Sequence, residues 1–274
     1  MSFFDWLFNG NKRKNDLIPL EQWKDVLFKQ VVFYRSLSED DQLVFIQKAD
    51  RFLATTRITG IKTEVREQDK ILLAAGAIIP IFSFPNWEYH NLDEVLLFPE
   101  HFDFNYQIGS KDMAVFGMVG YGYLNGKMAL SKKALHHGFK NEGDKRNTVI
   151  HEFIHLIDKA DGEIDGVFSE LQDPELIVPW LNLMDEKIQE IREGKSDIRT
   201  YGGSSRVEFL SVIGEYFFER PKLLEKKHPV LYEYLEMMFA RDMAEMDFVK
   251  KKKKVEHYDP CPCGSGNKFR ECCG

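Results

Sequence analysis

The chain has 274 residues, of which 43% are hydrophobic and 13% aromatic, which is enough for one large core or for one core with a small appendage. Its formal net charge of -7 argues against attraction of the whole molecule to nucleic acid or to an anionic membrane. No apolar run reaches the roughly 18 residues that a membrane span needs, so no span is expected.

The cysteines gather at one end of the chain, at positions 261, 263, 272 and 273. A secreted protein held by disulfides would distribute its cysteines through the body. The placement therefore predicts one compact metal site in a reducing, cytoplasmic compartment. The apolar residues 3–8 lack a leading basic region and a cleavage site, so they make a poor signal peptide. They are expected to pack on the body, with an interfacial or docking segment as the alternative.

In the first half of the chain, apolar spacing and capping residues set the predicted elements. Ser38 begins a capping-box pattern that Asp41 completes, and Pro99 stops an apolar run. In chain order, the predicted elements are a helix over 20–34, a helix over 42–55, a strand over 59–65, an apolar helix over 67–82 and a strand over 94–99.

In the second half, two strands over 113–120 and 126–130 flank a turn at Asn125-Gly126. Ser131 is expected to cap a short helix that runs to His137, and a longer helix over 144–160 should stop near Gly162. A loop with Pro174 and Pro179 follows. The remaining predicted helices cover 179–193, 205–219 and 229–246. Helices dominate around a small central sheet, so the predicted class is α+β.

The strongest signal in the body is the run His151-Glu152-Phe153-Ile154-His155. Residues four apart share a helix face, so both imidazoles can bind one Zn²⁺. Glu152 stands beside the first ligand, where a carboxylate can act as general base toward an activated water. The alternative is a chance match on an ordinary core helix, which is rare by composition and would bury two histidines without partners.

A catalytic zinc site of this kind needs a third protein ligand. The position six residues after His155 holds Asp161, which excludes the metzincin pattern. Glu208 and Glu215 lie seven residues apart in an otherwise apolar helix and can share one face. Either is a candidate ligand, because a carboxylate in apolar surroundings needs a partner; the alternative is a solvated residue or a salt bridge.

Three segments together resemble the Mlc titration factor A family: the run 151–158, the residues Asp165-Gly166-Val167, and the segment from Tyr201 to Phe218. Members of this family are zinc peptidases related to the catalytic domain of anthrax lethal factor. The resemblance covers roughly residues 20–245 and implies a mostly helical, zincin-like metallopeptidase fold. It also implies aminopeptidase-like activity as one plausible form of the reaction and a partner role toward the glucose repressor Mlc.

The resemblance also implies roles for single residues. It makes Glu208 the third ligand, leaves Glu215 in a supporting role, and gives Tyr201 a hydrogen bond to the developing oxyanion. Two roles are open for Asp158: it could orient a ligand histidine, or it could cap or form an ion pair on the helix surface. This chain has Arg206-Val207 where the family usually has Pro-Ala before the ligand glutamate, which changes the loop beside the expected groove.

Residues 259–274 resemble the SEC-C motif, which occurs at the C-terminus of the SecA translocation ATPase and in many other bacterial proteins. Four thiolates form a closed, structural zinc site, which assigns Cys261, Cys263, Cys272 and Cys273 to a second Zn²⁺. The alternative is a disulfide or free thiols. The motif implies binding to another protein or to the ribosome. The lysine run 250–254 is expected to be a solvated linker, with affinity for an acidic partner or RNA as the alternative.

The sequence thus predicts a metallopeptidase domain over 1–249, a basic linker over 250–258 and a zinc knuckle over 259–274. Two classes of function follow. The first is a zinc-dependent peptidase acting on peptide or protein substrates. The second is a non-catalytic regulatory protein that sequesters an Mlc-like repressor or acts as an adaptor directed by the knuckle. Glu152 favours the first class, since a pure binding protein needs no general base beside its zinc.

Overall fold

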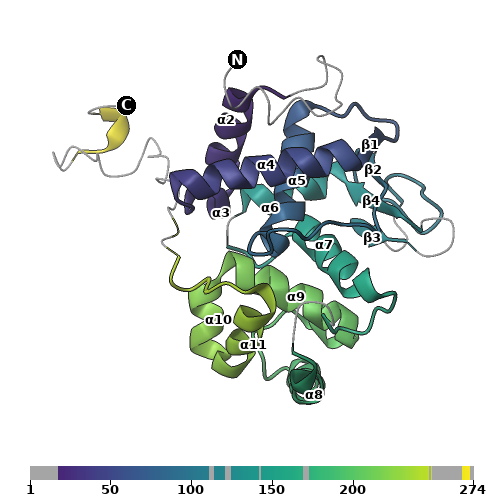
Figure 1. The fold of residues 1–274 in the computed structure, drawn as a ribbon, viewed down its shortest axis with the longest axis vertical. Coiled ribbons are helices and arrows are strands. Elements are labelled where there is room, and N and C mark those ends of the chain that lie inside the picture. Colours follow the sequence, from purple (N-terminus) through teal and green to yellow (C-terminus); the bar gives the residue numbers. More distant parts are fainter. Residues whose placement is uncertain are drawn as a thin grey trace.

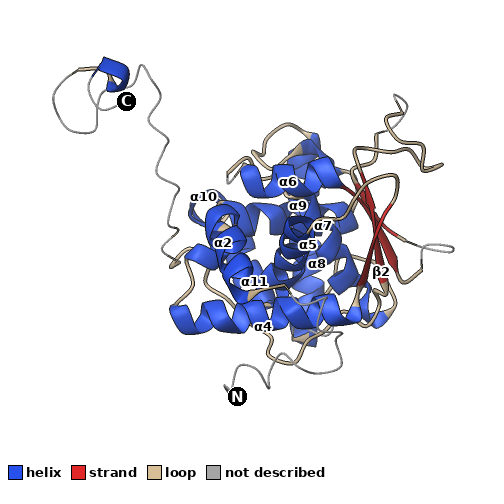
Figure 2. Cartoon of the chain, turned by 90° about the horizontal axis from the view of Figure 1, so that it is seen from above, coloured by secondary structure: helices blue, strands red, loops and turns tan. Residues whose placement is uncertain are grey.

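The computed structural model describes residues 18–110, 114–120, 125–141, 143–168, 173–246, 248 and 267–271. Most of the described elements are helices, and a small sheet stands at one side of them (Figures 1 and 2). The helices of the first half are α2 (Leu20–Gln30), α3 (Val32–Arg35), α4 (Glu39–Thr55) and α5 (Glu67–Ile81). No helix among the described residues is long and apolar enough to cross a membrane.

The sheet has the strand order β1-β2-β4-β3, with β1 (Arg57–Gly60), β2 (Glu94–Phe98), β3 (Gly117–Val119) and β4 (Lys127–Ser131). β2 pairs in parallel with β1 and β4, whereas β3 pairs antiparallel with β4 and forms an edge of the sheet. Glu94 holds the three parallel strands together at their start. Its buried carboxylate lies 2.9 Å from Arg57 Nε and 3.0 Å from Lys127 Nζ, and it accepts a hydrogen bond of 2.6 Å from Thr59.

The core of the molecule is built around α5, whose side chains from Ile71 to Ile81 are all buried. Such a helix can exist only with neighbours on every side. It packs against α2, α4, α6 (Lys132–Lys140) and α7 (Thr148–Asp158). Gly76 permits the approach of α7, because a Cβ at this position would lie 2.3 Å from a methyl of Val149. The helix α7 therefore runs through the interior, where Phe153 also contacts Phe52 and Tyr89 with ring centroids 5.6 and 5.0 Å away.

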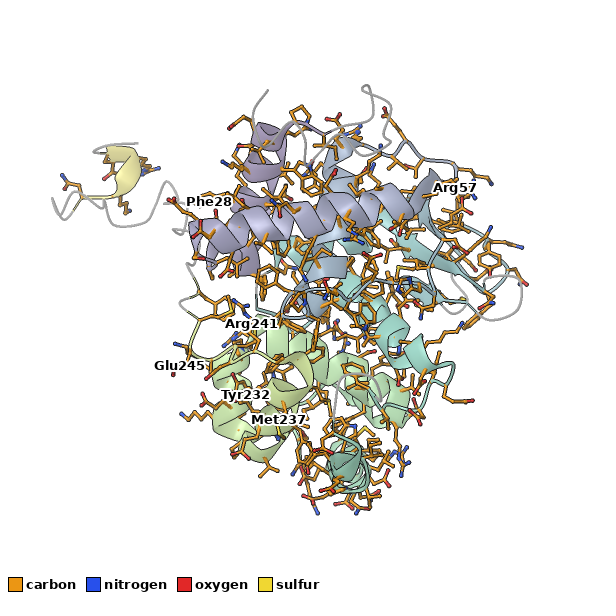
Figure 3. The ribbon with its side chains drawn as sticks, in the orientation of Figure 1. Phe28, Arg57, Tyr232, Met237, Arg241 and Glu245 are labelled. Atoms are coloured by element: carbon orange, nitrogen blue, oxygen red, sulfur yellow. The ribbon has the colours of Figure 1, made fainter. Side chains whose placement is uncertain are left out.

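The second half contains α8 (Ile177–Arg192), α9 (Arg206–Glu219), α10 (Pro221–Lys227) and α11 (Pro229–Phe239), with a 3-10 turn at Thr200–Gly203. After α11 the chain turns back at Ala240, whose φ is 49°. Tyr232 fixes this return: its hydroxyl donates to Asp242 (2.8 Å) and accepts the Ala244 N–H (2.7 Å). The guanidinium of Arg241, labelled with Tyr232 in Figure 3, lies over the Phe82 ring at 5.0 Å.

The predicted α+β class is confirmed, and several element boundaries differ from the prediction. The expected helix over 20–34 is divided at Val31, which has extended backbone angles. The expected helix over 144–160 begins only at Thr148, because Lys145 has a φ of 61° and Asn147 is the cap. The helix expected over 229–246 ends at Phe239, because the chain turns back at Ala240. The helix α10 was not predicted, and Pro221 stands at its first position.

The strands also differ in extent. The strand expected over 59–65 lies at 57–60, and the strand expected over 113–120 is limited to 117–119 among the described residues. The predicted helix caps are confirmed. The side-chain oxygen of Ser38 accepts the Asp41 N–H, and that of Ser131 accepts the Ala134 N–H. The helix after Ser131 continues to Lys140, past the predicted end.

Candidate metal centre

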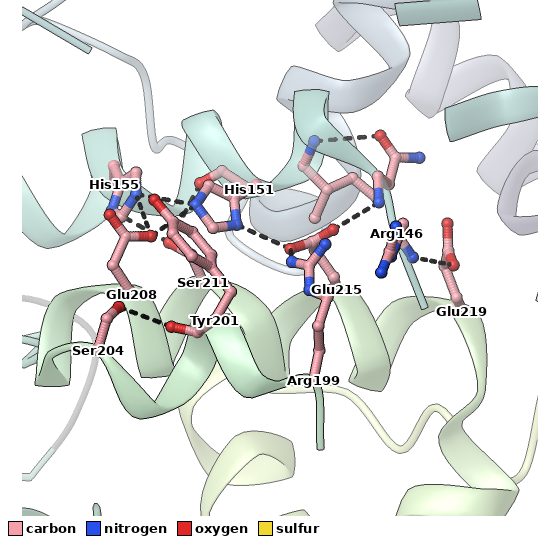
Figure 4. A network of polar contacts seen from close by, with 12 residues as sticks. Arg146, His151, His155, Arg199, Tyr201, Ser204, Glu208, Ser211, Glu215 and Glu219 are labelled. Atoms are coloured by element: carbon pink, nitrogen blue, oxygen red, sulfur yellow. Dashed lines mark hydrogen bonds and ion pairs between the residues drawn. The ribbon is translucent and has the colours of Figure 1, made fainter. Parts of the chain in front are cut away.

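The two histidines of the HExxH motif project from the buried helix α7 (Figure 4). The side chain of Asn147 caps the helix by accepting the Ile150 N–H. His151 and His155 are four residues apart, so they share one face, and only 7% and 8% of their surface is exposed. Their Nε2 atoms face each other at 3.1 Å.

The helix α9 brings a second set of polar groups to the same place. Ser205 caps this helix, and Glu208, Ser211 and Glu215 follow on one face at steps of three and four residues. Glu208 Oε2 lies 3.0 Å from His151 Nε2 and 3.6 Å from His155 Nε2. The predicted three ligands therefore meet in one cluster, with their donor atoms all within 4.8 Å of one another.

This geometry fits a tetrahedral metal ion. With metal–ligand bonds of about 2.0 to 2.1 Å, the ligand atoms of a tetrahedral site lie about 3.3 Å apart. The three separations between the donor atoms of His151, His155 and Glu208 are 3.0, 3.1 and 3.6 Å. Two imidazole nitrogens and one carboxylate leave a fourth position open, which is typical of a catalytic site and not of a structural one.

The second nitrogen of each histidine has its own partner. His151 Nδ1 lies 2.7 Å from Glu215 Oε1, and His155 Nδ1 lies 3.1 Å from Ser211 Oγ. Glu215 also accepts a hydrogen bond of 2.6 Å from the Asn147 N–H and forms an ion pair with Arg199. Such contacts fix the ring orientation and leave Nε2 free for a metal.

Sequence reasoning anticipated a supporting role for Glu215 but missed Ser211 and Arg199. The available signal for Ser211 was a polar residue three positions after Glu208 in an apolar helix. Arg199 carried no such signal, because only the fold brings it beside Glu215.

The electrostatics of the cluster favour a cation. Burial by itself lowers the pKa of His151, but the carboxylates of Glu208 and Glu215 outweigh it and raise the pKa to about 10. Burial likewise raises the pKa of Glu208, and the two histidines more than reverse this and hold it well below its usual range. The carboxylates thus stabilise a positive charge at the histidine pair, which a proton or a metal ion can supply.

Glu152 is buried between α7 and the edge strand β3. A Cβ at Gly117 would lie 2.4 Å from Glu152 Oε1, so only glycine lets this strand approach the carboxylate. Burial raises the pKa of Glu152, and the two histidines partly oppose that effect. A carboxylate with a raised pKa beside a metal site has the property that a general base needs.

Tyr201 lies at the mouth of the site, in the 3-10 turn before α9. The side chain is 51% exposed, and its ring centroid is 5.9 Å from that of His151. Ser204 Oγ donates to the Tyr201 carbonyl at 2.6 Å and fixes the turn (Figure 4). Burial of the phenol and the nearby carboxylate of Glu208 raise its pKa, so it remains a hydrogen-bond donor at neutral pH.

Asp158 does not contact a ligand histidine. Its carboxylate accepts the backbone N–H groups of Gly166 and Val167 at 3.0 to 3.1 Å. The residue therefore holds the loop after α7, a role that differs from both alternatives left open from the sequence, orienting a ligand histidine and pairing on the helix surface. Burial raises the pKa of Asp158 to about 7 against the effect of these hydrogen bonds. The ligand histidines are instead oriented by Glu215 and Ser211.

The four cysteines of the predicted knuckle lie outside the described residues. The described part of this segment is 267–271, with a 3-10 turn at Phe269–Glu271. The linker over 250–258 and the apolar residues 3–8 are also outside the described ranges.

The metal cluster opens into a cleft of about 840 Å³. The edge strand β3 and the preceding residues 114–116 form one wall, and α7 forms another. Tyr201, Val207 and Ile164 complete the lining near the ligands. Arg206, which stands where the resembling family has proline, forms an ion pair with Asp185 instead of entering this lining. The space is large enough for several residues of an extended peptide.

Comparison with known proteins agrees with this geometry. Similar proteins include an uncharacterized protein of Synechocystis sp., 25% identical over 80% of this chain and 83% of its own length. The Mlc titration factor A proteins of an Enterobacter species and of Pectobacterium atrosepticum are 25% and 24% identical, each over 86% of this chain and 91% of its own length. The family model described as glucose-regulated metallo-peptidase M90 matches residues 8–240, and that of the SEC-C motif matches residues 259–274. This chain therefore belongs to the M90 metallopeptidase family and carries a C-terminal SEC-C motif.

Proposed function

We propose that this protein is a zinc-dependent peptidase with His151, His155 and Glu208 as the zinc ligands. The observation that carries the proposal is the cluster itself: three donor atoms at the spacing of a tetrahedral site, beside a buried carboxylate and an open cleft. Zinc is favoured because two imidazoles and one carboxylate, with an open position, are its usual catalytic donor set.

The residues around the ligands supply the remaining chemistry. Bound Zn²⁺ would activate a water molecule and polarise the scissile carbonyl. Glu152 would accept the proton of the attacking water and deliver it to the leaving amine. Tyr201 would donate a hydrogen bond to the oxygen that becomes negative as the carbonyl is attacked. The phenol can do so only as a donor, which its raised pKa ensures.

The substrate would bind along the cleft as an extended chain. β3 uses one edge to pair with β4, and it lies at the end of the described sheet with residues 117–119 in the cleft wall. An extended peptide can add to such an edge through backbone hydrogen bonds. An aminopeptidase and an endopeptidase are both compatible with this cleft, and we propose the aminopeptidase form because of the family resemblance.

A regulatory role through a partner is the second function that we propose. Relatives of this chain are named Mlc titration factor A, a name that indicates titration of Mlc by those proteins. By this similarity, the chain would bind a transcriptional repressor of the same kind, and binding would not require catalysis. The SEC-C motif would hold a second, structural zinc through its four cysteines and contribute a further surface for a protein or the ribosome. The cysteine placement supports a reducing, cytoplasmic location.

The zinc content of three forms of the full chain tests this proposal. The unaltered chain should bind two zinc ions and cleave peptides. The His151→Ala/His155→Ala variant should retain one zinc ion and lose cleavage, and the Cys272→Ser/Cys273→Ser variant should retain one and still cleave. If the histidine variant binds as much zinc as the unaltered chain, the proposed catalytic site is wrong, and the binding function alone would remain.

A further inference from the structure

One cation in the cleft wall has no ionic partner among the residues that the structure describes. Arg146 lines the same cleft as the metal ligands, and its side chain is exposed. Its backbone N–H donates to Asp144 Oδ1 at 3.1 Å and to Glu219 Oε2 at 3.0 Å. The guanidinium itself, however, forms no ion pair or hydrogen bond with the residues that the structure describes.

The neighbouring cations differ in this respect. Lys145 Nζ lies 2.7 Å from Asp197 Oδ2, and Arg199 is paired with the buried carboxylate of Glu215. Both charges are therefore neutralised inside the protein. Of these three cations, Arg146 is the one that is exposed and lines the cleft without an ion pair to a described residue.

The two described carboxyl groups that accept the Arg146 backbone N–H form no ion pair with its guanidinium. Asp144 uses its oxygens for the Arg146 N–H and for the side chain of Asn141. Burial and the nearby carboxylates of Asp144 and Glu215 raise the pKa of Glu219 to about 9, so this group is uncharged at neutral pH. The positive end of the α7 dipole, which begins one residue after Asn147, adds to the field of the guanidinium.

We propose that Arg146 is a specificity residue that binds a carboxylate of the peptide substrate, either an Asp or Glu side chain or a C-terminal carboxylate. The inference rests on the proposed peptidase function, which it extends to a substrate class. A guanidinium recognises a carboxylate through two parallel hydrogen bonds between opposite charges. The neutral amide of glutamine or asparagine lacks the negative charge and therefore binds a guanidinium more weakly.

The position of Arg146 limits which residue of the substrate it can reach. Arg146 lies two residues before the start of α7 at Thr148, and His151 lies three residues after that start, so the Cα atoms of Arg146 and His151 are at most about 12 Å apart. An extended peptide covers about 3.3 Å per residue. The carboxylate that Arg146 binds should therefore lie within about four residues of the scissile bond.

Binding of synthetic peptides to the zinc-loaded Glu152→Gln protein tests the proposal without requiring turnover. The probes are fluorescein-labelled, C-terminally amidated octapeptides of alanine with one central phenylalanine. A single glutamate is placed at each other position in turn, and each peptide has a glutamine twin. A further series of glutamine peptides ends in a free carboxylate at increasing distance from the phenylalanine, and thus separates a C-terminal from a side-chain carboxylate.

We expect glutamate, or a free C-terminus, at one position to bind about tenfold more tightly than its neutral twin. In the Arg146→Gln/Glu152→Gln protein this preference should disappear, and in the Lys222→Gln/Glu152→Gln protein, which loses an exposed charge on α10, it should persist. A preference that survives in the Arg146→Gln protein, or the absence of any preference in the reference protein, overturns the proposal.

The failure of all peptides to bind also overturns it, because Arg146 would then anchor none of them. Casein cleavage by the zinc-loaded, unaltered chain decides separately whether the peptidase function holds. If the chain cleaves casein but the peptides show no preference for glutamate over glutamine, only the specificity role of Arg146 is wrong. If the chain cleaves no substrate, the proposed peptidase function is wrong as well.

Discussion

Two residues outside the ligand set fix the histidine rings of the candidate metal centre. Glu215 contacts His151 Nδ1, the Asn147 N–H and Arg199, and all three hold its buried carboxylate in one orientation. Ser211 links His155 Nδ1 to the His151 carbonyl. The ligand geometry therefore depends on the packing of α9 against α7 as much as on the ligands themselves.

Replacing Glu215 with glutamine should weaken metal binding. The amide keeps the shape of the side chain but removes the charge that orients His151 and balances Arg199. We expect metal affinity to fall about 10- to 100-fold, measured by competition with a chelator. Glu193→Gln, which removes an exposed carboxylate after α8, is the matched control and should retain the original affinity. Equal affinities in the two variants would contradict the orienting role.

Glu219 predicts a pH dependence of stability. Burial raises its pKa to about 9, so the folded chain binds this proton more tightly than the unfolded chain. Stability should therefore fall as pH rises between about 4.5 and 9, by an amount on the order of a few kcal/mol. Glu219→Gln should remove this loss. Urea unfolding at pH 5, 7 and 9 should therefore show that the free energy of unfolding of the variant rises relative to that of the original chain as pH increases. A difference independent of pH would show that Glu219 does not titrate in this way.

At the scale of secondary structure, the sequence predicted the two helices of the site well and the strand beside them less well. The apolar spacing and the HExxH run located α7, the cap Ser131 located the start of α6, and the helix predicted over 205–219 agrees closely with α9. Glu208 and Glu215 are seven residues apart, which already placed them on one face. These features depend on local periodicity, which a sequence displays directly.

The features that were not predicted depend on contacts between distant segments. The approach of Gly117 to Glu152 and the pairing of Arg199 with Glu215 join residues that no periodicity connects. The break at Val31 and the late start of α7 arise from single backbone conformations that tertiary packing selects. The role of Asp158 was left open for the same reason, since a buried carboxylate near a ligand can hold a loop instead.

Gly117→Ala tests the contact between the edge strand and the general base. The added methyl would lie 2.4 Å from Glu152 Oε1, so the carboxylate must move. A displacement of about 1 Å at a reacting group costs on the order of 100-fold in rate, and we expect a fall of this size in kcat with unchanged metal content. Gly143→Ala is the control, because its methyl would meet only the flexible end of Arg220. Full activity in Gly117→Ala would show that Glu152 need not occupy this position.

For the whole molecule, the metal centre joins two helices that are separated in the chain by α8. His151 and His155 come from α7, and Glu208 comes from α9. An ion that binds both helices stabilises the folded state and not the unfolded state, because the unfolded chain does not hold the three ligands together.

Removal of the metal should therefore lower Tm. Above the dissociation constant, each tenfold increase in free metal should raise the free energy of unfolding by about 1.4 kcal/mol, which corresponds to about 3 to 6 °C for a domain of this size. Calorimetry across a series of buffered zinc concentrations measures this slope. The His151→Ala/His155→Ala variant, which keeps the tail cysteines, should lose most of the dependence; an unchanged slope would assign the stabilising metal to the tail.

The most direct test of the account is peptide hydrolysis by the original chain and by Glu152→Gln at equal, measured zinc content. We expect that the original chain cleaves and that the variant retains its zinc but is slower by about 100- to 10,000-fold, because only the proton acceptor is lost. Equal rates in the two proteins, or no hydrolysis by the zinc-loaded original chain, would contradict the assignment of Glu152 and of the cluster of His151, His155 and Glu208 as a peptidase site.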